Sequence, residues 1–203
     1  MFTLHAAVIT VSDSCAAGQA CDKSGPLVRQ LLEESSAAAL GATVPRFQVT
    51  WSEVIPDERQ VIVKRIRVLA GQDSREDDGA SSVSGPPQPV DLIVTTGGTG
   101  ISARDVTPES TLEACEGRSV WGLSYLMLQV SLQYTPMAAL SRYGAGVCGS
   151  ALVINLPGKP SAVQEVLPAI KPVIVHGCML LHGHTRHGGE SDVPAQEATP
   201  NVQ

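Results

Sequence analysis

A glycine-rich stretch at residues 95–100, Thr-Thr-Gly-Gly-Thr-Gly, is the strongest candidate for binding chemistry in the sequence. Gly97, Gly98 and Gly100 remove side chains where a ligand could touch the backbone, and they permit positive φ angles that let successive N–H groups converge on an anion. The stretch lacks the Gly-Lys-Ser/Thr end of a P-loop and the G-x-G-x-x-G pattern of a dinucleotide turn. It indicates a phosphate cradle of another kind, with a tight strand-to-helix turn as the alternative.

Two aspartates stand close to predicted strand ends. Asp57 follows Ile55-Pro56, and Asp105 follows the glycine stretch. Two carboxylates near a phosphate site are useful mainly when they bind Mg²⁺ or orient the attacking group, because they would otherwise repel the ligand. Helix capping is the alternative for each aspartate.

Two further polar positions could contact a ligand. Ser141 and Arg142 offer a hydroxyl and a fixed positive charge for a second anionic or polar group, or they form a surface pair. Asn155 ends an apolar run just before Leu156-Pro157-Gly158, so it either contacts a ligand or stabilises the turn.

Apolar, β-branched runs alternate with helical patterns along the chain. Strands are expected over 5–11, 47–54, 90–96 and 151–156, and helices over 26–32, 57–69, 111–116, 121–132 and 161–181, the last interrupted at Pro168 and Pro172. Right-handed crossovers between such strands give an α/β fold with three layers, in which helices cover both faces of a mostly parallel sheet. Ligands bind beyond the carboxyl ends of such strands, where the glycine stretch lies.

The chain length suits one folded unit with a sizeable core, since two full domains would be cramped in 203 residues. We assign this domain to residues 1–182. Residues 72–89 are charged, small and proline-rich, which predicts a surface loop insertion, and 183–203 lose apolar periodicity, which predicts a disordered tail. Histidines near that end, His182, His184 and His187, lack the rigid frame of a metal site.

Charge and cysteine usage limit the partners. A formal net charge of -6 argues against nucleic acid as a partner, because an acidic surface repels phosphate backbones. Five scattered cysteines without a C-x-x-C pair predict reduced thiols and a cytoplasmic location. No uninterrupted apolar run approaches the roughly 18 residues of a membrane span, and the start of the chain is typical of a first strand rather than a signal peptide.

Four segments together resemble the molybdopterin adenylyltransferase family, which includes the amino-terminal domain of gephyrin. They are TVSDSCAAGQACDKSGP at 10–26, TTGGTGISARDVTPE at 95–109, TPMAALSR at 135–142 and INLPGKP at 154–160. The similarity extends over about residues 6–181, and the TTGGTG-x-x-x-RDVTPE string is highly specific.

The resemblance implies a trimeric enzyme that transfers AMP from MgATP to the terminal phosphate of molybdopterin and releases pyrophosphate. It implies catalytic roles for Asp57, Asp105 and Ser141, with Mg²⁺ at the two aspartates. The pterin side matches Ser131, Ser141 and Asn155. The implied substrate-binding residues are Ser12, Asp13, Gly97, Gly98, Thr99, Ser131, Asn155, Pro157 and Gly158.

The same resemblance implies partners and leaves alternatives. No second domain for molybdenum insertion fits in this length, so a separate insertase would be a transient partner. A pterin-binding paralogue of the same fold is one alternative, and a scaffold or binding module without catalysis is another. Because a pure scaffold needs no carboxylates beside a phosphate loop, Asp57 and Asp105 favour catalysis.

Three positions depart from the family pattern. Trp121, before Gly122, stands where relatives usually have a proline. Cys148 stands where an arginine is common, which predicts one positive charge fewer near the pocket. The 72–89 loop is longer than usual and is expected to affect only the surface.

Overall fold

Five strands form the central sheet of the computed structural model, which describes residues 3–34, 45–73 and 88–183. The strands are β1 (Thr3–Val11), β2 (Arg46–Ile55), β3 (Leu92–Thr96), β4 (Ala145–Cys148) and β5 (Ala151–Leu156). They lie in the order β2-β1-β3-β5-β4, and all neighbours are parallel except β4 and β5. The mostly parallel sheet is confirmed.

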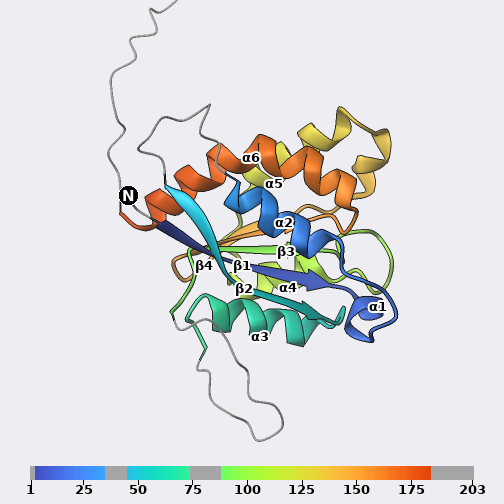
Figure 1. Ribbon diagram of the computed structural model, residues 1–203, viewed down its shortest axis with the longest axis horizontal. Helices are drawn as coiled ribbons and strands as arrows, with labels where there is room; N and C mark the ends of the chain where they lie inside the picture. Colours follow the sequence, from blue (N-terminus) through green and yellow to red (C-terminus); the bar gives the residue numbers. More distant parts are fainter. Residues whose placement is uncertain (1–2, 35–44, 74–87, 184–203) are drawn as a thin grey trace, which may run out of the picture.

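Helices cover both faces of this sheet (Figure 1). They are α1 (Asp13–Ala16), α2 (Ser24–Glu33), α3 (Arg59–Leu69), α4 (Thr107–Ala114), α5 (Trp121–Leu132), α6 (Pro160–Leu181) and the 3-10 helix η1 (Pro136–Leu140). On β1, Leu4 and Val8 pack into a core with α2, α5 and α6, whereas Ala7 and Ile9 pack into a second core with α3 and α4. Successive residues of a strand point to opposite faces, so two cores and three layers result.

The helix α6 corrects one prediction, because it continues through Pro168 and Pro172 without interruption. Both prolines are exposed. Each removes one helical N–H, and the carbonyl oxygens left without a donor belong to Gln164 and Pro168, two exposed residues near water. The opposite face, with Leu167 and Ile170, is buried in the core, and this packing stabilises the helix.

Length and composition alone would allow α6 to cross a membrane. In the fold, however, its buried side chains belong to the core against the sheet. The core helix of an α/β domain passes the same test, so the hydropathy of α6 follows from its packing.

Two smaller elements also differ from the sequence prediction. The strand β4 was missed because four residues, Ala-Gly-Val-Cys, are too short to show a period of two. The helix α4 begins at Thr107 instead of residue 111, since Pro108 occupies its first turn, where the missing N–H has no helical partner to lose.

The described residues leave two predictions open. Residues 74–87 of the predicted insertion and 184–203 of the predicted tail lie outside them. All five cysteines fall within the described ranges, and each is a free thiol. The prediction of reduced cysteines is confirmed for the fold.

A buried lysine ties α6 to α2. Lys171 is 8% exposed, and its Nζ donates to the carbonyl oxygens of Leu31 and Glu34, each at 2.6 Å. These oxygens lie at the carboxyl end of α2, where no further helical N–H can reach them. Burial lowers the pKa of Lys171, which the negative charge of Glu34 partly offsets.

We predict that Lys171→Met destabilises the fold by about 1–3 kcal/mol, because the apolar stem is kept while two carbonyl groups lose their donor. Urea unfolding measures the free energy of unfolding. Arg29→Met is the control, since it breaks only an exposed ion pair with Glu33 on the same helix and should cost about 0.5 kcal/mol or less. Equal losses of unfolding free energy in the two variants would show that the hydrogen bonds of Lys171 do not stabilise the contact between α2 and α6.

Candidate active site

The glycine turn follows β3 and is wedged between the ends of β1 and β5. Gly97 has φ 105°, and a Cβ there would lie 2.2 Å from the carbonyl oxygen of Val11. Its N–H donates to the carbonyl oxygen of Leu156 at 3.1 Å. Any larger residue would collide with the backbone, so the tight-turn interpretation of this glycine is confirmed.

The next glycines make room for the two candidate carboxylates. A Cβ on Gly98, which has φ 61°, would lie 2.8 Å from Oδ1 of Asp57. A Cβ on Gly100 would lie 2.9 Å from Oδ2 of Asp105. The two aspartates, 48 positions apart in the sequence, therefore approach the same turn.

All four carbonyl oxygens of the turn accept hydrogen bonds from the protein. Thr107 donates through Oγ1 to Gly97 at 2.9 Å and through its N–H to Gly98 at 3.1 Å. Arg142 donates through its N–H to Thr99 at 2.8 Å and through Nε to Gly100 at 2.6 Å. This arrangement fixes the orientation of every peptide group in the turn.

The N–H groups of the turn are different. Within the ranges that the structure describes, no protein acceptor takes the N–H groups of Gly98, Thr99 and Gly100. Three neighbouring donors without a partner, beside a positive φ angle, are what a backbone anion site requires. The turn can therefore be both a structural necessity and a phosphate cradle.

The ends of β1 and β2 are locked together by two aspartates. The N–H of Asp13 donates to Oδ2 of Asp57 at 2.8 Å, and the N–H of Asp57 donates to Oδ1 of Asp13 at 3.0 Å. Asp57 does not cap α3, whose cap position is Glu58. Asp105 accepts from the N–H of Ser102 at 2.8 Å and does not cap α4, so both capping alternatives are wrong.

Charge accumulates at this junction. The pKa of Asp57 is raised above its usual value, first by burial and further by the negative charges of Asp13 and Asp105. The pKa of Asp13 is lowered, chiefly by the hydrogen bond from the Arg104 side chain and then by the N–H of Asp57. The site therefore has an excess of negative charge that a bound cation would relieve.

The donor set fits a magnesium ion that arrives with a phosphate. Among the described residues, no group of three or more His, Cys, Asp and Glu side chains could hold a metal ion by itself. Magnesium in nucleotide sites uses one or two carboxylates together with water and phosphate oxygens. Asp57 and Asp105 could supply these carboxylates.

Arg142 corrects another expectation. Besides Gly100, its guanidinium contacts the carbonyl oxygen of Asp105 and the carboxylate of Glu109. Its charge is used inside the protein, so the expected role of holding a second anion is wrong. The surface-pair alternative is wrong as well, because the side chain is partly buried and clamps the turn.

The predicted pterin-side hydroxyls of Ser131 and Ser141 meet at Tyr143. Ser131 is buried, and its Oγ lies 2.6 Å from the Tyr143 hydroxyl. Burial raises the pKa of Tyr143, and hydrogen bonds with Ser131 and Ser141 partly offset that rise. Tyr143 thus brings Ser131 and Ser141 together, although sequence reasoning missed the tyrosine.

Asn155 is fully buried beside the turn. Its Nδ2 donates to Oγ1 of Thr95 at 2.9 Å and to Oγ1 of Thr111 at 2.8 Å, while Oδ1 has no partner among the described residues. The side chain therefore joins β3 to α4 rather than stabilising its own turn. A Cβ on Gly144 would lie 2.1 Å from Oδ1, so only glycine fits next to it.

The remaining predicted residues gather at the ends of β1 and β5. Ser12 caps α1 by accepting from the N–H of Cys15 at 3.3 Å. The carbonyl oxygen of Pro157 accepts from Oγ1 of Thr96 at 2.8 Å, and a Cβ on Gly158 would lie 3.2 Å from Cα of Gly97. The structure thus brings this group to the glycine turn, as the sequence predicted.

Two hollows open in the region of the candidate site. One, of about 240 Å³, lies beside the turn and includes Ser12, Lys23, Gly97 and Gly158 in its lining. Hydroxyl groups, the Lys23 ammonium group and the Asp22 carboxylate border it. The sequence reasoning had missed Lys23, although it lies within the segment 10–26 that carries the family resemblance.

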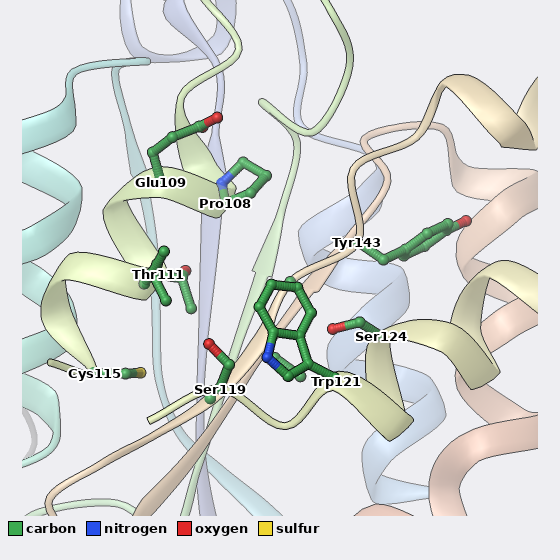
Figure 2. Close-up of a pocket in the computed structure, with 12 residues that line it drawn as sticks. Pro108, Glu109, Thr111, Cys115, Ser119, Trp121, Ser124 and Tyr143 are labelled. Atoms are coloured by element: carbon green, nitrogen blue, oxygen red, sulfur yellow. The ribbon is translucent and has the colours of Figure 1, made fainter. Parts of the chain in front are cut away.

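The second hollow, of about 150 Å³, lies between α4 and α5 and is lined mainly by apolar atoms (Figure 2). Figure 2 shows the indole of Trp121 at this hollow, with Ser119 and Ser124 on either side of it and the Tyr143 hydroxyl turned away. Pro108, at the start of α4, also lines it. The hollow is therefore three residues from Asp105 along the chain.

Cys148 lies far from this edge of the sheet. It pairs with Ala151 at the start of β5, whereas the turn adjoins Leu156 at the end of that strand. The thiol is buried and donates to the carbonyl oxygen of Ala114, and burial raises its pKa to about 11. Ala114 adjoins Cys115, which lines the second hollow, so the effect of Cys148 on the charge near that hollow stays a prediction.

Comparison with known proteins agrees with the fold. Residues 7–176 match the family described as probable molybdopterin binding domain. The chain is 34% identical to molybdopterin adenylyltransferase of Helicobacter pylori strain J99 over 195 residues, which cover 96% of this chain and 97% of the relative. It is 35% identical to molybdopterin adenylyltransferase of Escherichia coli strain K12, over 87% of this chain and 80% of the relative.

A solved structure extends the similarity. The molybdopterin biosynthesis enzyme MoaB from Thermus thermophilus superimposes with a TM-score of 0.71 at 38% identity, covering 89% of this chain and 98% of that one. The three-layer architecture and the sequence similarity thus extend over the same residues. The chain belongs to the molybdopterin-binding domain family.

Proposed function

We propose that the chain is a molybdopterin adenylyltransferase, which transfers AMP from ATP to the terminal phosphate of molybdopterin and releases pyrophosphate. The observation that carries the proposal is the glycine turn, whose carbonyl groups are all bonded while three N–H groups have no acceptor among the described residues. Asp57 and Asp105 approach the same turn. Similarity to adenylyltransferases over nearly the whole chain supports the assignment.

The two hollows suit the two substrates. We assign the nucleotide to the hollow that includes Ser12, Lys23 and Gly158, because an ammonium group and hydroxyls match phosphate and ribose. We assign the pterin ring to the apolar hollow beside Trp121, since a flat heterocycle gains from aromatic and aliphatic walls. The phosphate groups of both substrates then meet at the turn.

The reaction is an in-line displacement. An oxygen of the terminal phosphate of molybdopterin forms a bond to the α-phosphorus, and the bond from that phosphorus to pyrophosphate breaks. The attacking phosphate is already ionised at neutral pH, so no residue has to remove a proton. The N–H groups of Gly98, Thr99 and Gly100 would hold phosphate oxygens in line and stabilise their charge.

Asp57 and Asp105 would hold a Mg²⁺ ion that accompanies ATP. When bound, the ion supplies charge neutralisation on the triphosphate. The reciprocal bonds between Asp13 and Asp57 fix one of these carboxylates before the substrates arrive. Ser141, next to the clamp residue Arg142, would position the pterin side through Tyr143.

The helix α5 supports a homotrimer. Trp121 and Tyr125, one turn apart, are 73% and 66% exposed, and Leu132, Met137 and Leu140 continue the apolar surface. A helix that is apolar on all sides is normally covered, so we propose that other copies of the chain cover this face. We further propose a cytoplasmic enzyme that passes its product to a separate molybdenum insertase, without nucleic acid or membrane partners.

The first test is Asp57→Asn. We expect this variant to form no adenylylated molybdopterin while it still binds the pterin, because the amide keeps the hydrogen bond from Asp13 but loses the charge. Chromatography of the product after incubation with molybdopterin, ATP and Mg²⁺ measures the reaction. Glu58→Gln, which removes an exposed neighbouring charge, should retain wild-type turnover. Normal turnover in Asp57→Asn would remove this residue from catalysis.

The same variant should be more stable than the wild type at neutral pH. A carboxyl whose pKa is raised in the fold destabilises the fold when it ionises, so this cost is present above the folded pKa and disappears below its ordinary value of 3.8. We expect Asp57→Asn to raise the melting temperature by a few degrees at pH 7, with no gain left near pH 3.5. Scanning calorimetry of both proteins between pH 3.5 and 7 measures the melting temperatures. A rise in melting temperature that does not depend on pH would contradict the charge argument.

The trimer is tested with Tyr125→Glu. A charge in the centre of the apolar α5 face should convert the trimer into monomers, as measured by light scattering after gel filtration. Val173→Glu provides the matched control, because Val173 is also exposed but lies on α6, outside this face. It should leave the trimer intact. A monomeric wild type would overturn the proposed assembly.

A further inference from the structure

Arg104 forms an ion pair across the mouth of the candidate site. Its Nε lies 3.0 Å from Oδ2 of Asp13, and its Nη2 lies 2.8 Å from Oδ1, so the pairing is bidentate. The two residues are 91 positions apart and connect the loop after the glycine turn with the start of α1. The arginine side chain is 61% exposed, and an exposed pair of this kind contributes little free energy.

The charges around this pair do not balance. The negative charges of Asp13 and Asp105 both act on Asp57, and the positive charge of Arg104 acts on Asp13 and Asp57. One guanidinium leaves two of the three negative charges uncompensated. An incoming triphosphate would be repelled unless a divalent cation came with it, and such a cation would also release Arg104 from its role at Asp13.

Arg142, the other arginine at the turn, is not available to bind the triphosphate. The Arg142 guanidinium already contacts Gly100, Asp105 and Glu109, and breaking these contacts would loosen the turn itself. The side-chain bonds of Arg104 go instead to Asp13, which is another exposed side chain. The guanidinium of Arg104 can therefore move without a change in the fold.

We propose that Arg104 is a catalytic residue that leaves Asp13 and binds the triphosphate of ATP when MgATP enters. This inference rests on the proposed function and adds a residue to it. A planar guanidinium that fits a carboxylate with two bonds fits two phosphate oxygens in the same way. The exchange replaces an exposed carboxylate by a more highly charged phosphate.

The chemical consequence lies in the leaving group. As the bond between the α-phosphorus and the bridging oxygen breaks, negative charge grows on pyrophosphate. The Arg104 guanidinium would stabilise that charge, and it stays protonated throughout, so no proton is transferred. Asp13 meanwhile keeps its bond from the N–H of Asp57 and needs no new partner in the protein.

The kinetic test compares Arg104→Gln with Arg59→Gln in the full chain. Arg59 is the matched control, because it also forms an exposed pair, with Glu113 at 2.7 Å, but lies on α3. We expect Arg104→Gln to lower kcat about 1,000-fold or more with a smaller change in KM for pterin, as for arginines that contact a transferring phosphate. Arg104→Lys should retain only a small part of the wild-type kcat, whereas Arg59→Gln should have the kcat of the wild type. Equal kcat in the two glutamine variants would overturn the inference and leave the proposed function intact.

A binding test separates phosphate contact from support of Asp13, and it needs no turnover. Calorimetry with ATP and Mg²⁺, without molybdopterin so that no product can form, should show at least about tenfold weaker binding for Arg104→Gln. Asp13→Asn, which frees Arg104, should bind ATP at least as tightly as the wild type. If Asp13→Asn loses the same affinity as Arg104→Gln, the arginine only supports Asp13 and the inference is wrong. Urea unfolding confirms that each variant is folded, and wild type that binds ATP but forms no product would contradict the proposed function alone.

Discussion

The hydrogen bonds that Thr107 and Arg142 donate to the glycine turn determine what the rest of the site can do. Each carbonyl oxygen of residues 97–100 accepts one of these hydrogen bonds, so the peptide planes of the turn cannot rotate. The N–H groups that have no partner among the described residues are therefore held in place before any ligand arrives. Such preorganised donors lose little free energy on binding, because the protein has already ordered them during folding.

Holding carboxylates next to this turn has an energetic cost. Asp57 is partly buried among like charges, and the fold tolerates it because Gly98 leaves space and the N–H of Asp13 provides a hydrogen bond. A site that binds a cation together with a phosphate gains from this excess of negative charge. The same excess reduces the stability of the free protein, a common trade-off between function and stability.

Much of the fold could be predicted, because the β-branched runs and the helical spacing between them are local signals. The continuous α6 could not, since the effect of Pro168 and Pro172 depends on which helix face meets water. The glycine turn and both aspartates could be named from the sequence. Whether each aspartate caps a helix or faces the ligand site, however, depends on contacts between residues dozens of positions apart. For the same reason the inward-facing guanidinium of Arg142 was misjudged.

The two hollows of the candidate site have a consequence for what happens after the proposed reaction. If one substrate occupies each hollow, the joined product contacts the lining of both hollows. One molecule then makes both sets of contacts. Attachment at two points raises the effective concentration of each half at its own hollow, so spontaneous escape is slow. Under the proposed reaction, pyrophosphate would be held at one site only and would leave first. The joined product would then stay in the two hollows after pyrophosphate has left.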